Sequence, residues 1–202
     1  MVVAGVVLAG GASRRMGGLD KAALQVGGIT LLDRVLAAAR PVCDPLVVVG
    51  PVRATDVAGV AFVSEAVPGG GPVPAILAGV EAAGPECDVV LVLAVDLPLL
   101  TTGHLRRLIA ALDDAGAGAA ASAEEDGPNP LLAAYRVSDL SARAAGLDLG
   151  PGAPARRLLP GDPLVVELGP AALNVNRPDD RAAAEIRGAN DKQPPRSAPK
   201  TP

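Results

Sequence analysis

The sequence predicts an α/β fold, a three-layer α/β/α sandwich in which helices cover both faces of a mostly parallel sheet. Through the first two thirds of the chain, short apolar runs alternate with segments whose apolar residues recur at helical spacing, and this alternation is typical of parallel strands joined by helical crossovers. The apolar residues are also almost all aliphatic: 50% of the 202 residues are hydrophobic, but the chain has one Phe, one Tyr and no Trp. Parallel strands buried on both faces have this composition.

The expected strands are apolar runs bounded by glycine, proline or polar residues. The run VVLVLAV at 89–95 is apolar on both faces, so we expect it near the centre of the sheet. The other expected strands lie at 2–8, 45–49, 60–64, 131–135 and 164–167, and the stretch GAGAAAS at 116–122 is a further candidate.

The expected helices follow from apolar residues at helical spacing and from residues that begin or end a helix. A first helix is expected over 29–39, where Pro41 ends it. A second is expected over 74–83, with a proline in its first turn, and a third begins at a cap formed by Thr102. Further helices are expected over 138–145, 154–159 and 178–187.

The chain is long enough for one domain with its own core and short for two. We therefore expect a single domain over residues 1–187. From residue 188 the sequence GANDKQPPRSAPKTP lacks large apolar residues that could anchor it, so residues 188–202 are expected to form a disordered C-terminal tail.

Charge and composition argue against several classes of protein. The formal net charge of −4 does not favour binding to nucleic acid or to an anionic membrane. No apolar stretch reaches the roughly 18 residues that a membrane-spanning helix needs, and no signal-peptide pattern is recognisable.

Cys43 and Cys87 form neither a disulfide framework nor a metal-ligand spacing, and His104 is expected to cap a helix or lie on the surface. We therefore expect a cytoplasmic protein, monomeric or weakly oligomeric.

The stretch VVLAGGASRRMGGLDK, residues 6–21, carries the strongest functional signal. An expected strand ends at paired glycines, which are followed by two arginines, two more glycines and an Asp-Lys pair. Glycine lets successive backbone N–H groups turn toward an anion, and nearby cations reinforce the attraction. The candidate anion-binding residues are Gly10, Gly11, Gly17 and Gly18 for the backbone, and Arg14, Arg15 and Lys21 for the charge.

Two familiar phosphate loops do not fit this stretch. The pattern G-x-G-x-x-G occurs neither at Gly10-Gly11 nor in the glycine run at 69–71. A P-loop requires a glycine directly before its lysine and a hydroxyl directly after it, whereas Lys21 is preceded by Asp20 and followed by Ala22. The spacing therefore argues against a dinucleotide-binding fold and against a P-loop NTPase.

Asp96 follows the most apolar expected strand, where an ionised carboxylate is costly without a partner. It could cap the next helix, or it could hold Mg²⁺ together with nucleotide phosphates, since Mg²⁺ typically takes only one or two carboxylates. Pro98 and the threonines at 101 and 102 favour the metal ligand, because a turn and another cap come first. Glu65 ends another expected strand and either faces the same cleft or is solvated.

Four segments resemble, in order, the nucleotidyltransferases that make molybdenum cofactor dinucleotides, a family with a Rossmann-like, nucleotide-diphospho-sugar transferase fold. They are LAGGASRRMGGLDK at 8–21, SEAVPGGGPVPAILAG at 64–79, LAVDLPLL at 93–100 and LNVNRPDD at 173–180. The first segment is highly specific, the third moderately so, and the resemblance covers roughly residues 1–187.

One branch of that family transfers GMP and a sister branch transfers CMP, and Gly11 and Asp20 match the guanylyl branch. The resemblance therefore implies that the chain joins GTP and Mo-molybdopterin to give molybdopterin guanine dinucleotide and pyrophosphate, with Mg²⁺ as cofactor. It also implies transient contact with molybdoenzymes or their chaperones. The open alternatives are a relative that uses CTP, one that acts on a sugar or polyol phosphate, and a non-catalytic nucleotide-binding relative.

The resemblance also implies roles for single residues. The catalytic set is Lys21, Arg15 and Asp96, of which Asp96 holds the metal. The nucleotide-binding set is Leu8, Ala9, Gly10, Gly11, Ser13, Arg14, Gly17, Lys21, Glu65 and Asp96, and the acceptor-side candidates are Asn129, Asn174 and Asn176.

At three places the sequence departs from the family pattern. Glu65 stands where aspartate is usual, and Val73-Pro74-Ala75 stands where Leu-Ala-Gly is usual. Gly50 stands where some relatives carry an asparagine that contacts the base. Part of the guanine recognition is therefore expected to come from the backbone or from another side chain.

Overall fold

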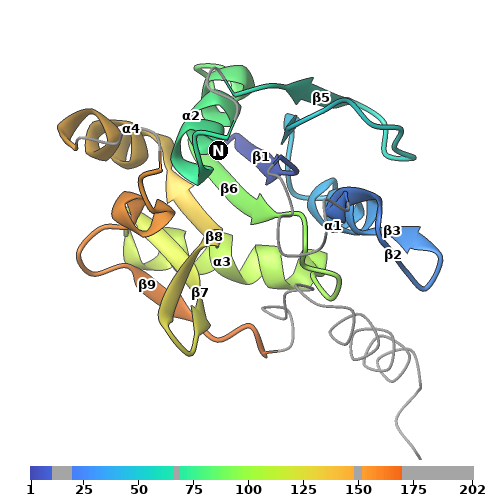
Figure 1. Cartoon of the computed structure of the whole chain (residues 1–202). Helices are drawn as coiled ribbons and strands as arrows, with labels where there is room; N and C mark the ends of the chain where they lie inside the picture. The colour runs from blue at the N-terminus through green and yellow to red at the C-terminus, as the bar shows by residue number, and fades with distance from the viewer. Residues whose placement is uncertain (11–19, 66–68, 148–151, 170–202) are drawn as a thin grey trace, which may run out of the picture.

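The computed structural model describes residues 1–10, 20–65, 69–147 and 152–169. Its centre is a seven-stranded sheet with the strand order β5-β4-β1-β6-β8-β7-β9 (Figure 1). The strands are Val3–Leu8 (β1), Leu46–Val49 (β4), Val60–Val63 (β5), Val89–Ala94 (β6), Ala119–Glu124 (β7), Gly127–Arg136 (β8) and Leu164–Val166 (β9).

The sheet is mostly parallel, as predicted. β1 pairs in parallel with β4 and β6, β4 with β5, and β7 with β9, whereas β8 is antiparallel to both of its neighbours. All these strands except β8 therefore end along the same edge, which we call the carboxyl edge. The apolar run predicted to be central forms β6, whose residues from Val89 to Leu93 are 0% exposed.

Helices cover both faces of the sheet, which confirms the three-layer sandwich (Figure 1). On one face α1 (Leu31–Ala39) and α3 (Thr102–Ala115) pack against β1, β4 and β6. On the other face lie α2 (Pro72–Ala83), α4 (Val137–Gly146) and the 3-10 turn η3 (Ala155–Leu158). Between β1 and α1 the chain forms a second 3-10 turn, η2 (Lys21–Ala23), and a small hairpin of β2 (Gln25–Val26) and β3 (Ile29–Thr30).

The starts of α1 and α3 differ from the sequence prediction because a threonine hydroxyl caps each helix at another position, and α2 begins at Pro72, two residues earlier than predicted. Thr101, not Thr102, caps α3: its Oγ1 accepts from the backbone N–H of His104, and His104 Nδ1 accepts from the backbone N–H of Thr101. This reciprocal capping box confirms the capping role expected for His104. Residues 29–30 form a strand rather than the first turn of α1, because Thr30 Oγ1 caps that helix by accepting from the N–H of Asp33 at 3.0 Å.

The helix predicted over 154–159 is shorter than expected. Residues 155–158 form a single 3-10 turn between Pro154 and Pro160. The helix expected over 178–187 and the tail expected over 188–202 lie outside the described residues. Among the helices that the described residues form, none is long and apolar enough to cross a membrane.

Gly79 brings α2 unusually close to the sheet. A Cβ placed on Gly79 would lie 2.3 Å from Val6 Cγ1 and 3.0 Å from Val49 Cγ2. Such distances lie well inside van der Waals contact, so the helix can approach β1 and β4 only where it has no side chain. This contact fixes α2, which follows the glycine run at 69–71, against β1, which precedes the basic segment.

We expect Gly79→Ala to lower the free energy of unfolding by about 1–2 kcal/mol, because overpacking a tight core costs about 1–3 kcal/mol and the gain in helix propensity offsets up to about 1 kcal/mol. Urea denaturation measures the change. Gly146→Ala is the matched control, since Gly146 ends α4 and a Cβ there has no atom within 4 Å. Equal stability of the two variants would contradict the close approach.

Candidate functional site

The carboxyl ends of β1 and β6 form the point at which the order of the strands reverses. The chain leaves β1 for β4 and β5 on one side, and then crosses to β6 on the other side. Leu8 at the end of β1 pairs with Ala94 at the end of β6. In open α/β sheets, ligands bind outside the carboxyl ends of the strands at such a switch point.

Lys21 and Asp96 meet at this switch point. Lys21 begins η2 after the connection from β1, and Asp96 lies two residues beyond the end of β6. Lys21 Nζ lies 3.0 Å from Asp96 Oδ2, and the two side chains are only 23% and 16% exposed. The fold therefore brings together two predicted catalytic residues that are 75 positions apart in the sequence.

The helix-cap alternative for Asp96 is excluded, because Thr101 caps the following helix. Among the residues that the structure describes, no group of three or more His, Cys, Asp or Glu side chains could hold a metal ion. A single carboxylate at the carboxyl edge does not make a resident metal site, but it suits Mg²⁺, which is commonly held by one carboxylate and completes its shell with substrate phosphates and water.

Asp20, directly before Lys21, is held by an arginine that the sequence analysis did not identify. Arg53 Nε donates to Asp20 Oδ2 at 2.7 Å and Arg53 Nη2 donates to Asp20 Oδ1 at 2.9 Å. The hydrogen bonds from Arg53 lower the pKa of the Asp20 carboxyl, and the backbone N–H groups of Ala22 and Ala23 add to the shift. The sequence signal that could have pointed to Arg53 is its place on the loop after β4, a buried strand that ends at the same edge of the sheet.

Gly50, which begins that loop, touches the backbone after β1. A Cβ on Gly50 would lie 2.8 Å from Gly10 N and 2.9 Å from Ala9 C, and the φ of Gly50 is +148°. A side chain at this position therefore does not fit this backbone. In the resemblance, Gly50 stands where some relatives carry an asparagine that contacts the base. In this structure Gly50 brings the loops after β1 and β4 into contact.

The backbone predicted to contact a nucleotide is fixed from both sides. Ala9 N–H donates to the Val49 carbonyl at 3.0 Å, and Val95 N–H donates to the Leu8 carbonyl at 3.3 Å. Gly10 follows them and is exposed. The other candidates of the basic segment, Gly11, Ser13, Arg14, Arg15, Gly17 and Gly18, lie outside the described residues.

Glu65 lies beyond β5, at the far side of β4 from β1. Its Oε1 accepts from the backbone N–H of Gly69 at 2.7 Å, so its carboxylate stabilises the glycine-rich turn before α2. In the segment Val73-Pro74-Ala75, which departs from the family pattern, Val73 is 0% exposed and belongs to the core between α2 and the sheet. The unusual valine therefore has a packing role.

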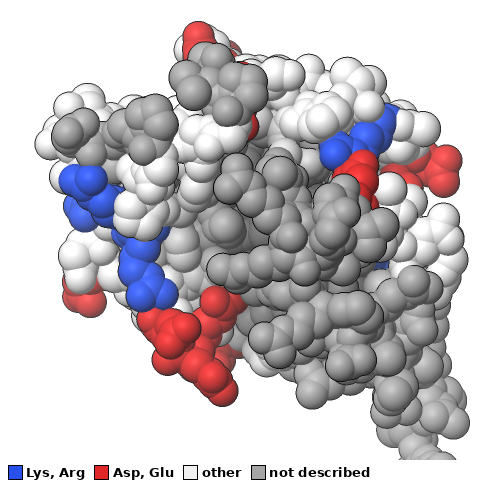
Figure 2. Space-filling view, viewed as in Figure 1, with Lys and Arg blue, Asp and Glu red and all other residues white. Residues whose placement is uncertain are grey.

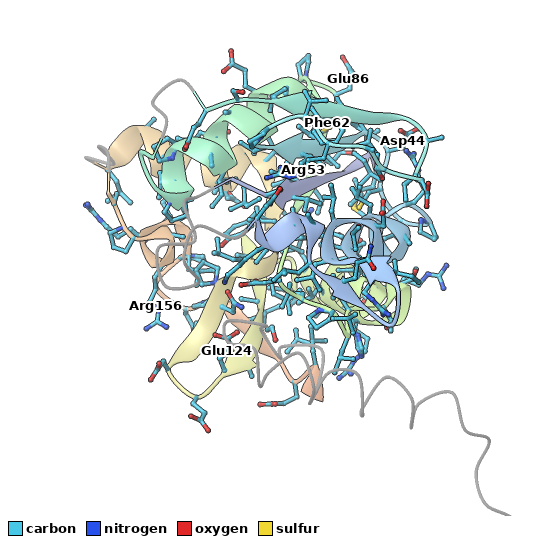
Figure 3. The ribbon with its side chains drawn as sticks, turned by 45° about the vertical axis from the view of Figure 1, so that its right-hand side comes forward. Asp44, Arg53, Phe62, Glu86, Glu124 and Arg156 are labelled. Atoms are coloured by element: carbon cyan, nitrogen blue, oxygen red, sulfur yellow. The ribbon has the colours of Figure 1, made fainter. Side chains whose placement is uncertain are left out.

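Asn129 lies in β8, which extends toward the carboxyl edge as a hairpin with β7. The side chain is 7% exposed; its Nδ2 donates to Glu124 Oε1 at 2.6 Å and its Oδ1 accepts from Leu131 N–H at 2.8 Å. Figure 3 shows Glu124 and the exposed Arg156 on the same side of the molecule. In Figure 2 this side carries basic atoms beside acidic ones. The other acceptor candidates, Asn174 and Asn176, lie outside the described residues.

The cysteines take no part in this site. Cys43 is 2% exposed, and burial raises the pKa of its thiol to about 12. Burial also raises the pKa of Cys87, and the carboxylates of Asp88 and Glu86 add to the effect. Both thiols are therefore protonated at neutral pH, which argues against nucleophilic catalysis by cysteine.

The fold and these residues define an α/β protein with a pair of opposite charges at the switch point of a mostly parallel sheet. The model of the MobA-like NTP transferase domain matches residues 5–160. The chain belongs to this family and is a nucleotidyltransferase.

Curated relatives cover the chain to different extents. A protein of Mesorhizobium japonicum named molybdenum cofactor guanylyltransferase is 35% identical over 138 residues, which are 66% of each chain. A protein of Mycobacterium avium named probable molybdenum cofactor guanylyltransferase is 33% identical over 195 residues, which are 93% of this chain and 98% of the relative.

Solved structures share the fold. Molybdopterin-guanine dinucleotide biosynthesis protein A from Archaeoglobus fulgidus matches with a TM-score of 0.69 and 24% identity, over 94% of this chain and 100% of that one. The 2-C-methyl-D-erythritol 4-phosphate cytidylyltransferase from Thermus thermophilus matches with a TM-score of 0.67 and 23% identity, again over 94% and 100%. The second match shows that the fold by itself does not define the substrate.

Gly50→Ala tests the contact between the loops after β1 and β4. We expect it to destabilise the protein by about 1–3 kcal/mol, the cost of a residue held in an unfavourable backbone conformation, and to shift the amide resonances of Ala9 and Gly10 in a ¹⁵N–¹H spectrum. Gly28→Ala is the control, because Gly28 has a φ of +78° but no atom within 4 Å of its Cβ. Unchanged resonances at Ala9 and Gly10 in Gly50→Ala would refute the contact.

Asp20→Asn tests the ion pair with Arg53 through its pH dependence. The folded state lowers the pKa of Asp20, so the carboxylate contributes stability above its unfolded pKa, near 4, and loses it as the pH falls through the lower folded value. At pH 7 we expect the free energy of unfolding of the wild type to exceed that of Asp20→Asn by at most about 1 kcal/mol, because a partly exposed pair is screened by solvent. This difference should vanish at low pH. Chemical denaturation at a series of pH values measures it. A difference that grew on acidification would contradict the pair.

Proposed function

We propose that the chain is a molybdenum cofactor guanylyltransferase, which transfers GMP from GTP to Mo-molybdopterin and releases pyrophosphate. The observation that carries the proposal is the Lys21–Asp96 pair at the switch point of the sheet, 3.0 Å between Nζ and Oδ2. The family of the chain and the names of its relatives support the choice of substrates.

The reaction exchanges one phosphoanhydride bond for another. An oxygen of the Mo-molybdopterin phosphate attacks the α-phosphorus of GTP, the bond between that phosphorus and the oxygen bridging to the β-phosphorus breaks, and pyrophosphate leaves. No covalent bond to the protein is required, so catalysis depends on holding the two phosphates in line and on neutralising their charge.

Lys21 supplies positive charge in this proposal. Its ammonium lies on a flexible four-carbon stem, so a small reorientation exchanges the Asp96 oxygen for an oxygen of the triphosphate. Arg15 belongs to the same basic segment, and we assign it to bracing the triphosphate. Leu8, Ala9 and Gly10, whose backbone is fixed between β4 and β6, are assigned to the nucleoside.

Asp96 is the residue that would hold Mg²⁺. When bound, Mg²⁺ neutralises negative charge on the triphosphate and polarises the phosphoryl group under attack. The partly buried position of Asp96 beside Lys21 suits this role. Water screens the attraction between a carboxylate and a cation less in such a position than on the open surface.

The acceptor is assigned to the side of the carboxyl edge where β7 and β8 extend. Asn129 is the described candidate there, held by Glu124 and Leu131, and we assign Asn174 and Asn176 to the same ligand. In this assignment the β7–β8 side and the β4 side of β1 take the two substrates on either side of Asp96.

We expect Asp96→Asn to reduce pyrophosphate release from GTP and Mo-molybdopterin by at least about 100-fold, because removing one group that stabilises developing charge costs on the order of 10²–10³ in rate. Lys21→Ala should raise the Kd for GTP by about tenfold, the loss of roughly 1.4 kcal/mol of binding. Coupled pyrophosphate detection and calorimetry measure the two effects, each with GTP and with CTP in the presence of Mg²⁺.

Asp113→Asn is the matched control, since Asp113 is also paired with a cation, Arg136 at 3.2 Å, but lies on α3 near its carboxyl end. It should leave turnover and GTP affinity unchanged. Turnover with CTP in place of GTP would overturn the guanylyl assignment. GTP binding without turnover in the presence of Mo-molybdopterin would instead identify a non-catalytic relative.

A further inference from the structure

The loop after β4, residues 50–57, is exposed but held at three points. At its start, Gly50 N–H donates to the Val63 carbonyl at 2.8 Å. At its end, Thr55 Oγ1 donates to Asp33 Oδ1 at 2.6 Å and Asp56 N–H donates to the same oxygen at 3.2 Å. The middle point is Arg53. We call this segment the β4 loop.

Arg53 is the one contact from the middle of the β4 loop to the turn of Lys21 among the hydrogen bonds of the described residues. Its Nε and Nη2 form a fork on Asp20, and its Nη1 donates to the carbonyl of Pro51 at 2.9 Å. The side chain is 17% exposed, whereas the neighbouring Val52 is 80% exposed. Figure 3 shows Arg53 close to the blue turn that contains η2.

The oxygens of Asp20 are largely occupied by these contacts. Oδ1 accepts from Arg53 Nη2 and from the backbone N–H of Ala22, and Oδ2 accepts from Arg53 Nε. A carboxylate offers about four acceptor positions, and these contacts take three of them. Asp20 therefore acts through Arg53 and through the turn that it caps.

The β4 loop and the turn of Lys21 border different parts of the site. The β4 loop begins against Ala9 and Gly10, which the proposed function assigns to the nucleoside. The turn that Asp20 caps carries Lys21, which the proposed function assigns to the triphosphate. The Arg53–Asp20 fork is thus a rigid link between the nucleoside side and the phosphate side.

We propose that Arg53 is a positioning residue for the nucleotide: through Asp20 it fixes the β4 loop relative to Lys21, so that the base and the triphosphate of one nucleotide bind together. This inference rests on the proposed function. Lys21 pairs with Asp96 at 3.0 Å, whereas the hydrogen bonds of Arg53 go to Asp20 and to the Pro51 carbonyl. The fork should therefore matter for a complete nucleotide and not for inorganic triphosphate, which contacts only the phosphate side.

Arg53→Lys is the decisive variant, because lysine keeps the charge and cannot form a two-point fork. We expect the Kd for GTP to rise about tenfold, the Kd for inorganic triphosphate to change less than about twofold, and KM for GTP to rise while kcat stays within about threefold. Calorimetry and steady-state kinetics measure these values. A merely structural role would weaken both ligands or neither, and either result overturns the proposal.

Arg40→Lys is the matched control. Arg40 Nη2 lies 2.9 Å from Asp44 Oδ1, in an ion pair separate from that of Arg53 with Asp20. Asp44 precedes β4, at the edge opposite the site. This variant should leave all four measured values unchanged.

Asp20→Asn and the double variant with Arg53→Lys show whether the two residues act as a unit. If they do, the double variant binds GTP no more weakly than the weaker single variant. Multiplied effects would overturn the link. If wild type binds no guanine nucleotide, the proposed function fails; if wild type binds GTP and Arg53→Lys equals Arg40→Lys, the positioning role alone fails.

Discussion

The parallel pairing of β1 with β6 is the constraint on which the site depends. It sets the ends of the two strands side by side, with Leu8 opposite Ala94, and so brings the turn of Lys21 to Asp96. The strands can pair there because β6 is buried on both faces and α2 approaches β1 without a side chain at Gly79. Packing and chemistry are therefore linked: the core places two strand ends, and those ends place opposite charges in a region of limited solvent access.

Around that pair, backbone contacts fix the strand ends and side-chain contacts fix the loops. Backbone hydrogen bonds to Val49, at the end of β4, and to Val95, just beyond β6, fix Leu8 and Ala9. Side-chain forks and caps fix the loops, through Arg53 on Asp20 and through Asp33 on Thr55 and Asp56. Each carboxylate accepts several donors, so a small number of acidic residues orders a large part of the carboxyl edge.

Much of the fold could be predicted from the sequence, because apolar runs and glycine or proline boundaries are local signals. The strands near 2–8, 45–49, 60–64 and 89–95 were predicted within a few residues. The errors fell at helix starts, where Thr101 rather than Thr102 caps α3 and Thr30 caps α1, and at residues 155–158, which form only a 3-10 turn. The candidate site was predicted in part, since Lys21 and Asp96 lie in motifs of their own. Arg53 was not identified, because it lies in no recognisable motif and its partner Asp20 is 33 positions away.

The sequence by itself determined the α/β class, the basic glycine-rich segment and the carboxylate at the end of the central strand, because each of these is a property of contiguous residues. The tertiary structure alone decided which strand ends meet, that Gly50 packs against Ala9 and Gly10, and that Asp20 is engaged by Arg53. These contacts join residues that are distant in the sequence, and they arise from the strand order and from close packing. No local pattern of residues encodes the distance between Lys21 and Asp96; the pairing of β1 with β6 sets it.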